Sequence, residues 1–129
     1  VAVDVGFGDS LTTFVDLAQT LAARRSNGTL RVVGTESDAE RLAAGRKALA
    51  AIEGLCREPS VTLRAGEQDG WFVLPLEDGE AAPVFVRVLN VLRDYHPHDA
   101  LRGLQTLGRQ LAPGGLLMEG SASTEGDRA

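Results

Sequence analysis

Apolar residues in this chain occur in short continuous runs that alternate with stretches of helical spacing. In the first run, four of the residues 1–5 are Val or Ala, and from Leu11 to Ala22 apolar residues then recur every three or four positions. A short run of this kind is typical of a strand buried in a parallel sheet, and the recurrence is typical of an amphipathic helix. The pattern predicts a strand, a turn and a helix at the start of the chain.

The same alternation continues to residue 120. It predicts further strands at 30–36, 61–65, 84–89 and 116–120. A second helix is expected after Ser37 or Asp38, and a third over 99–111, with Leu101, Leu104, Gly108 and Leu111 facing inward. The stretch 66–83 has no helical period and is expected to be a long connection. Alternating strands and helices predict one α/β domain over 1–129, with a doubly wound, mainly parallel sheet and helices on both faces.

Polar or glycine residues follow four of the predicted strands. These are the segment with Gly6, Gly8 and Ser10, then Glu36, then Gly66 and Glu67, and finally Asn90. In open parallel sheets, ligands bind outside the carboxyl ends of the strands, near the point where the strand order reverses. We therefore expect these residues to lie along one rim of the sheet.

Composition and charge narrow the choice of partners. The formal net charge is −5 with a pI near 5.0, and no basic stripe indicates a nucleic-acid partner. No apolar run approaches the roughly 20 residues that span a bilayer, so no membrane partner is expected. The single Cys56 fits a cytoplasmic protein without internal disulfides. Abundant Ala, Gly and Arg, with Lys47 as the only lysine, favour a high-GC bacterial source.

The glycine segment does not fit a dinucleotide site. That motif needs a third glycine where Leu11 stands and an acidic residue about 20 positions further on. Glu36 follows Gly8 by 28 positions, and the segment has no lysine of the kind that holds phosphates in a P-loop. A nicotinamide dehydrogenase is therefore disfavoured.

The segment instead fits the pattern Asp-x-Gly-x-Gly-x-(Gly or small), with Asp4, Gly6, Gly8 and Ser10 in the named places. With this pattern the chain resembles the class I, S-adenosylmethionine-dependent methyltransferases. The resemblance covers essentially the whole chain. It includes the acidic end of the second strand at 33–38, Gly66 and Glu67 after the third strand, and the helix, Pro-Gly-Gly turn and strand at 107–117. The Asn-Val-Leu-Arg segment at 90–93 is similar to that of a bacterial subgroup.

The resemblance implies a Rossmann-like methyltransferase fold with S-adenosylmethionine as cofactor and S-adenosylhomocysteine as product. The first glycine segment would lie beneath the ribose and methionine, a carboxylate would bind the ribose hydroxyls, and the end of the third strand would border the adenine. The implied cofactor-binding residues are Asp4, Gly6, Phe7, Gly8, Ser10, Glu36, Ser37, Gly66, Glu67 and Asn90. Implied substrate-binding residues are Asn90, Arg93 and Tyr95, and no catalytic residue is indicated.

Some positions depart from the family pattern. Ser10 replaces a glycine, and Phe7 stands where a small residue is common. Members that methylate amino groups often carry Asn-Pro-Pro-Tyr where this chain has Asn-Val-Leu-Arg at 90–93, so that kind of N-methylation is not indicated. The resemblance also implies further elements before the first strand and after the fifth.

Structural roles remain open for several of these residues. Glu36 could be a solvated carboxylate at a strand end, Asp4 a turn-forming residue and Asn90 a cap for the backbone. His96 and His98 lack the two further ligands that a zinc site needs, so no metal is expected. Trp71 and Phe72 could cap a substrate or adenine pocket, but an anchor that holds the long connection through hydrophobic packing is the favoured interpretation.

Two functional hypotheses follow. The first is a methyltransferase that acts on a small-molecule substrate. The second is a non-catalytic, methyltransferase-like module that binds the cofactor or a partner. The fifth strand is apolar and has no predicted neighbour on one side, so a homodimer through this open edge is a further expectation.

Overall fold

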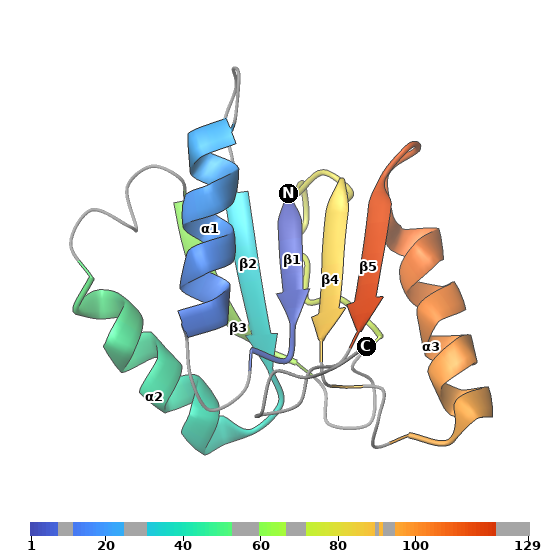
Figure 1. Ribbon diagram of the computed structural model, residues 1–129, viewed down its shortest axis with the longest axis horizontal. Coiled ribbons are helices and arrows are strands. Elements are labelled where there is room, and N and C mark those ends of the chain that lie inside the picture. The colour runs from blue at the N-terminus through green and yellow to red at the C-terminus, as the bar shows by residue number, and fades with distance from the viewer. Residues whose placement is uncertain are drawn as a thin grey trace.

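The computed structural model describes residues 1–7, 12–24, 31–52, 60–66, 72–89, 91 and 95–120. Strands and helices alternate as the apolar pattern predicted, except that β4 follows β3 with no described helix between them, and Figure 1 shows their arrangement. In chain order the elements are β1 (Ala2–Val5), α1 (Thr12–Arg24), β2 (Arg31–Glu36), α2 (Ala39–Ala50), β3 (Ser60–Ala65), β4 (Phe85–Leu89), α3 (Pro97–Gln110) and β5 (Leu116–Gly120). None of the described helices is long and apolar enough to cross a membrane.

The strands form one parallel sheet in the order β3-β2-β1-β4-β5. β1 lies in the middle, with Ala2 level with Val32 of β2 on one side and with Phe85 of β4 on the other. From β1 the chain winds outward first to β2 and β3 and later to β4 and β5. The doubly wound topology is confirmed, and the strand order reverses between β1 and β4.

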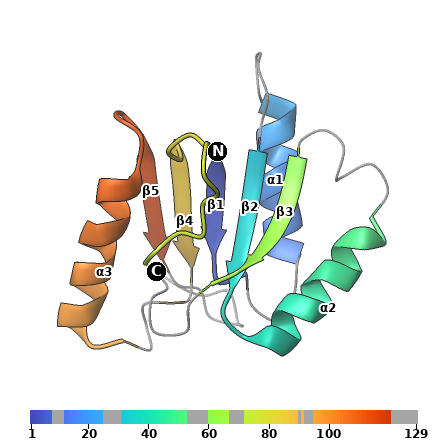
Figure 2. The same ribbon diagram turned by 180° about the vertical axis from the view of Figure 1, so that it is seen from behind.

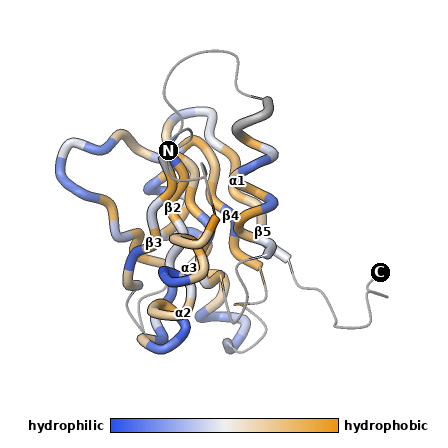
Figure 3. Tube along the Cα trace, turned by 90° about the vertical axis from the view of Figure 1, so that its left-hand side faces the viewer, coloured by the Kyte–Doolittle hydropathy of each residue, from blue (hydrophilic) through white to orange (hydrophobic). Residues whose placement is uncertain are grey.

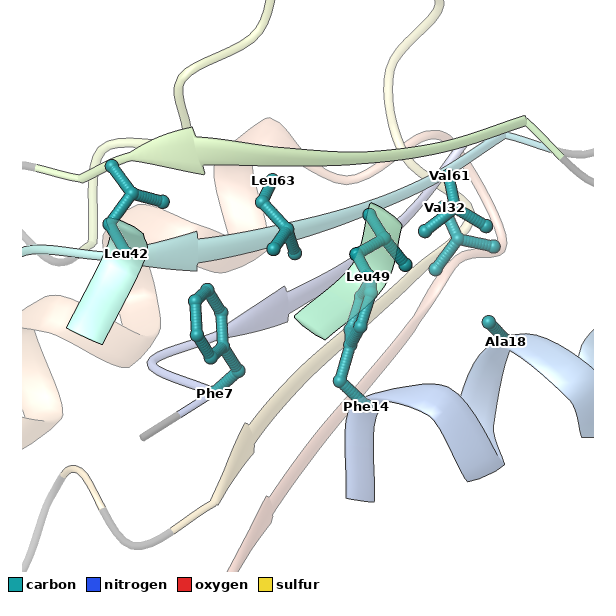
Figure 4. Close-up of a cluster of buried hydrophobic side chains, with 8 residues drawn as sticks. All are labelled: Phe7, Phe14, Ala18, Val32, Leu42, Leu49, Val61 and Leu63. Atoms are coloured by element: carbon teal, nitrogen blue, oxygen red, sulfur yellow. The ribbon is translucent and has the colours of Figure 1, made fainter. Parts of the chain in front are cut away.

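Two buried clusters fill the space on the two faces of the sheet. Helices α1 and α2 cover one face, as Figure 1 shows, and the connection 72–84 crosses the other, as Figure 2 shows from behind. Hydrophobic residues follow the strands, while hydrophilic residues gather on the outer helices (Figure 3). The first cluster, drawn in Figure 4, comprises Phe7, Phe14, Ala18, Val32, Leu42, Leu49, Val61 and Leu63. The second comprises Val3, Val5, Val33, Leu74, Val86, Val88 and Leu107.

A glycine in α2 makes room for an aromatic ring in the first cluster. A Cβ added at Gly45 would lie 2.7 Å from Cε1 of Phe7, closer than carbon atoms approach without displacement. Gly45 is buried, so the ring of Phe7 packs directly against the helix backbone. This close approach explains why α2 tolerates a residue with low helix propensity in its interior.

The inward face of α3 agrees with the expected one only in part: Leu111 packs against the second cluster and Leu104 is half-buried. Leu101 is 54% exposed and Gly108 is also exposed, whereas Gly103 and Leu107 are buried. Residues on one face of a helix are three or four positions apart, so Gly103 shares a face with Leu107. Leu101 is six positions before Leu107 and lies on another side of the helix. The helix also begins earlier than expected, because Pro97 occupies its first turn.

Strand β5 is at one edge of the sheet in the part of the chain that the structure describes. Its side chains Leu116 and Met118 are 60% and 47% exposed. Apolar side chains on an exposed edge strand favour association. The homodimer through this edge stays a prediction.

The connection 72–84 contains no helix, as expected, and a polar side chain of α3 holds its first residues. Gln110 of α3 donates to the carbonyl of Phe72 at 2.6 Å and accepts from the amide of Leu74 at 3.0 Å. Phe72 packs against the second cluster, in agreement with the anchor interpretation; Trp71 lies outside the described residues. Backbone groups of the connection thus find partners without a regular element.

Glu80 anchors the other end of the connection through two arginines. Its side chain is 3% exposed, and its carboxylate accepts hydrogen bonds from Arg64 at 2.6 and 2.9 Å and from Arg31 at 2.8 Å. The hydrogen bonds from Arg64 hold the pKa of Glu80 well below its usual range, and bonds from Arg31 and from the amide of Glu77 act in the same direction against the effect of burial. Glu80 therefore binds β2 and β3 in its ionised form.

Replacing Glu80 with glutamine is expected to lower the free energy of unfolding by about 1.5–3 kcal/mol at pH 7, the usual contribution of hydrogen bonds to charged groups. Because the pKa of Glu80 is lower in the folded state, its stabilisation is present above the unfolded-state pKa of about 4.3 and is lost as the pH falls towards the folded-state pKa. The difference between wild type and variant should therefore narrow between pH 7 and about pH 3. Urea denaturation at both pH values measures it, and an unchanged difference would contradict this role.

Candidate functional site

The ends of β1, β2 and β3 are joined by backbone hydrogen bonds. The amides of Gly6 and Phe7 donate to the carbonyl of Thr35 at 2.9 and 3.1 Å. On the other side of β2, the amide of Gly66 donates to the carbonyl of Glu36 at 3.0 Å. The structure thus brings Gly6, Glu36 and Gly66 together on one rim, as the sequence pattern predicted.

Gly6 begins the turn after β1 in a conformation that other residues rarely adopt. Its φ is +69°, and a Cβ added there would lie 2.9 Å from Cγ2 of Val91. Both the backbone angle and the neighbouring side chain exclude a larger residue. Val91 therefore covers the side of Gly6 on which a side chain would lie, and glycine fits the backbone angle that the turn requires.

Glu36 ends β2 and is only 6% exposed. Its Oε2 accepts a hydrogen bond from the amide of Asp38 at 3.0 Å. Asp38, one of the two residues expected to cap α2, is the N-cap and accepts from the amide of Arg41 at 3.0 Å. The start of α2 therefore orients the carboxylate of Glu36, while Ser37 between them is exposed. This bond fixes one oxygen of the Glu36 carboxylate at the start of α2.

Asp4 forms a buried ion pair with Arg87, which lies level with it on β4. Nε of Arg87 donates to Oδ1 of Asp4 at 3.1 Å, and Nη2 donates to Oδ2 at 2.7 Å. Nη2 also donates to the carbonyl of Thr13 in the first turn of α1, at 3.2 Å. Burial raises the pKa of Asp4 above its usual value, while the hydrogen bonds and charge of Arg87 act to lower it. Both carboxylate oxygens of Asp4 therefore bind Arg87. A contact of Asp4 with the cofactor stays a prediction.

The two parts of Phe7 have different surroundings. Its amide belongs to the rim through the bond to Thr35, and its ring is buried in the first cluster, 6.3 Å from the ring of Phe14. Figure 4 shows the ring pointing between α2 and the sheet. Phe7 can therefore contribute its backbone to a ligand site, while its side chain supports the turn from below.

Comparison with solved structures identifies the fold. The chain superposes on the glycopeptide N-methyltransferase MtfA complexed with sinefungin, with a TM-score of 0.61 and 25% identity, over 92% of this chain and 42% of that one. It also superposes on PigF with S-adenosylhomocysteine, with a TM-score of 0.62 and 19% identity, over 92% of this chain and 30% of PigF. The chain has the Rossmann-like methyltransferase fold.

The similarity was found in the comparison with solved structures alone. No family model and no curated protein matches the chain. A further structure, LepI in complex with S-adenosylmethionine, has a TM-score of 0.62 at 16% identity over 99% of this chain and 28% of LepI. The chain therefore spans less than half the length of these three methyltransferase-fold proteins.

Several residues expected in the cofactor and substrate sites lie outside the described part of the methyltransferase-like fold. They are Gly8, Ser10, Glu67, Asn90 and Arg93. Tyr95 is described; it is half-buried and packs against the second cluster. Their roles in binding stay predictions.

His96 and His98 have a structural role at the start of α3. Nδ1 of His96 accepts from the amide of His98 at 3.2 Å, and the two rings stack with centroids 5.7 Å apart. Among the described residues, no group of three or more His, Cys, Asp or Glu side chains could hold a metal ion. The pair therefore caps the helix.

Arg87 is the residue of this site that sequence reasoning missed. It interrupts the apolar strand β4 between Val86 and Val88, as Asp4 interrupts β1 between Val3 and Val5. Two opposite charges inside buried strands are strongly disfavoured unless they pair. This signal, combined with the adjacency of the first and fourth strands in doubly wound sheets, could have identified the pair.

Proposed function

We propose that this protein is an S-adenosylmethionine-dependent methyltransferase that acts on a small molecule. The observation that carries the proposal is the buried carboxylate of Glu36, oriented by the start of α2 at the end of the strand whose Thr35 carbonyl binds the turn at Gly6. An ionised carboxylate can accept hydrogen bonds from both hydroxyls of a ribose, which neutral groups match poorly. Glu36 would hold the sugar of the cofactor, and the backbone after β1 would approach its ribose and methionine.

The chain fits the cofactor in two further respects. The amides of Gly6 and Phe7 bond the turn after β1 to the end of β2, so this turn would lie along the ribose that Glu36 binds. The amide of Gly66 donates to the backbone carbonyl of Glu36, so the ends of β2 and β3 lie side by side, and the adenine would lie along the end of β3. The structurally similar MtfA forms complexes with S-adenosylmethionine, S-adenosylhomocysteine and sinefungin, which supports this ligand class.

The reaction needs little acid–base chemistry from the protein. The sulfonium of S-adenosylmethionine supplies an activated methyl group, which a nucleophilic atom of the acceptor attacks in line with the departing thioether. Holding the two reactants in that alignment, away from water, supplies much of the acceleration. The role of the chain would be to orient the cofactor through Glu36 and the turn, with Asn90, Arg93 and Tyr95 as the residues proposed to contact the acceptor.

The alternative is a module that binds the cofactor or a partner without turnover. Both oxygens of Asp4 bind Arg87, which favours a structural role for this residue of the glycine motif. One matching chain is described as a pericyclic reaction enzyme, so proteins of this fold perform chemistry other than methyl transfer.

Titration calorimetry with S-adenosylmethionine and S-adenosylhomocysteine tests cofactor binding. Saturable binding of both is expected, and the absence of binding to a folded sample would refute the methyltransferase proposal. Incubation with S-adenosylmethionine labelled in its methyl group and a small-molecule extract then tests turnover. Label transferred to a small molecule supports the enzyme, whereas binding without transfer favours the non-catalytic module.

A further inference from the structure

The buried pair of Asp4 and Arg87 interrupts an apolar row that crosses the sheet. The strand register places Leu63, Gly34, Asp4, Arg87 and Met118 side by side from β3 to β5. Asp4 is 4% exposed and Arg87 is 8% exposed. Two apolar side chains of similar volume would serve stability there as well or better, because removing two charges from water offsets most of their attraction. The pair therefore points to a role beyond stability.

The contacts of Arg87 show what this role is. Its guanidinium binds Asp4, which lies two residues before Gly6, through both carboxylate oxygens. The same group donates to the carbonyl of Thr13, the second residue of α1. The rigid, planar guanidinium of Arg87 thus binds both Asp4, near the end of β1, and Thr13, at the start of α1. The segment that carries the glycine motif runs between these two points.

We propose that Arg87 is a positioning residue for the cofactor site, which acts by fixing both ends of the glycine segment. The inference rests on the proposed function, because the segment between Asp4 and Thr13 is the part expected beneath the cofactor. A segment with both ends fixed loses less conformational freedom when a ligand binds, so more of the contact energy becomes affinity. Arg87 itself need not touch the ligand.

Replacement of Arg87 tests the inference through affinity. Arg87→Met should weaken binding of S-adenosylhomocysteine, measured by calorimetry, by about 10-fold or more, the range found for residues that orient ligands of metal sites. Arg87→Lys should have an intermediate effect, because an ammonium can pair with Asp4 but lacks the planar fork that reaches Thr13 at the same time.

Glu80→Gln is the matched control. It also disrupts a buried carboxylate–arginine contact, but its partners Arg31 and Arg64 belong to β2 and β3 and the glycine segment is not among them. Affinity of this variant should stay within about 2-fold of wild type, as expected for distant, independent sites. All titrations are done at a temperature at which urea denaturation shows each variant to be folded. A variant that only loses stability would then bind as wild type does.

The outcomes separate this inference from the proposed function. Wild-type binding together with Arg87→Met affinity within about 2-fold of wild type would overturn the positioning role. If wild type itself does not bind, the methyltransferase proposal fails, and hydrogen exchange of peptides covering residues 6–20 decides the inference without a ligand. Faster exchange of these peptides in the Arg87→Lys and Arg87→Met variants, but not in Glu80→Gln, supports the inference that Arg87 fixes both ends of the segment. Equal exchange in all three variants overturns it.

Discussion

Replacing Asp4 with alanine is expected to lower the free energy of unfolding by about 3–5 kcal/mol, the cost of leaving a buried charge without its partner. Arg87 would keep its positive charge, because a guanidinium does not lose its proton in proteins. At 8% exposure it cannot regain its hydration without moving out of the sheet. Urea denaturation at pH 7 measures the loss.

The reverse change is expected to be milder and to depend on pH. In Arg87→Met, Asp4 stays buried but can take up a proton, because the interactions that lower its pKa are gone and burial still raises it. A raised folded-state pKa means that stability is retained below the unfolded-state pKa and is lost as the pH rises through the folded-state value. The variant should therefore lose more stability, relative to wild type, at pH 8 than at about pH 5.

The double variant Asp4→Leu with Arg87→Met provides the control for these two changes. With both charges replaced by apolar groups, the free energy of unfolding should return to within about 1 kcal/mol of wild type or exceed it. An Asp4→Ala variant that loses less than about 1 kcal/mol would show that the pair contributes no more than an exposed ion pair does.

Replacing Glu36 with glutamine is expected to reduce affinity for S-adenosylhomocysteine by about 10- to 100-fold, since hydrogen bonds to a charged group contribute about 1.5–3 kcal/mol and each 1.4 kcal/mol is a factor of ten. Glutamine keeps the shape of the side chain but has one acceptor oxygen instead of two. That oxygen is already drawn towards the amide of Asp38, so the amide nitrogen would face the ribose. Titration calorimetry measures the change.

Glu40→Gln is a suitable control for Glu36. Glu40 lies in the first turn of α2, four residues further along, and is exposed. The Glu40→Gln variant loses the same charge from the same end of the molecule, so its affinity for S-adenosylhomocysteine should stay within about 2-fold of wild type. Equal losses in both variants would mean that general electrostatics, and not contact with the ribose, accounts for the effect of Glu36.

The sequence by itself determined the class of fold and the place of the site. Short apolar runs and helical spacing encode which segments are strands and helices. A strand buried on both faces needs consecutive apolar residues, whereas a helix buried on one face needs them every three or four positions. Alternation of the two then leaves the doubly wound parallel sheet as the arrangement that buries all of them. Gly6, Glu36 and Gly66 could be placed on one rim for the same reason, since parallel strands end at the same edge.

Only the tertiary structure decided which residues face each other within that frame. The partner of Asp4 lies 83 residues away; the two charges inside apolar strands suggest a pair, but the observed register of β1 and β4 is what places Arg87 level with Asp4. The ring of Phe7 turns into the core because Gly45, on another element, leaves room for it. Local periodicity carries no information on such contacts between distant segments; they depend on how the elements pack, and this packing decides what surrounds each residue of the site.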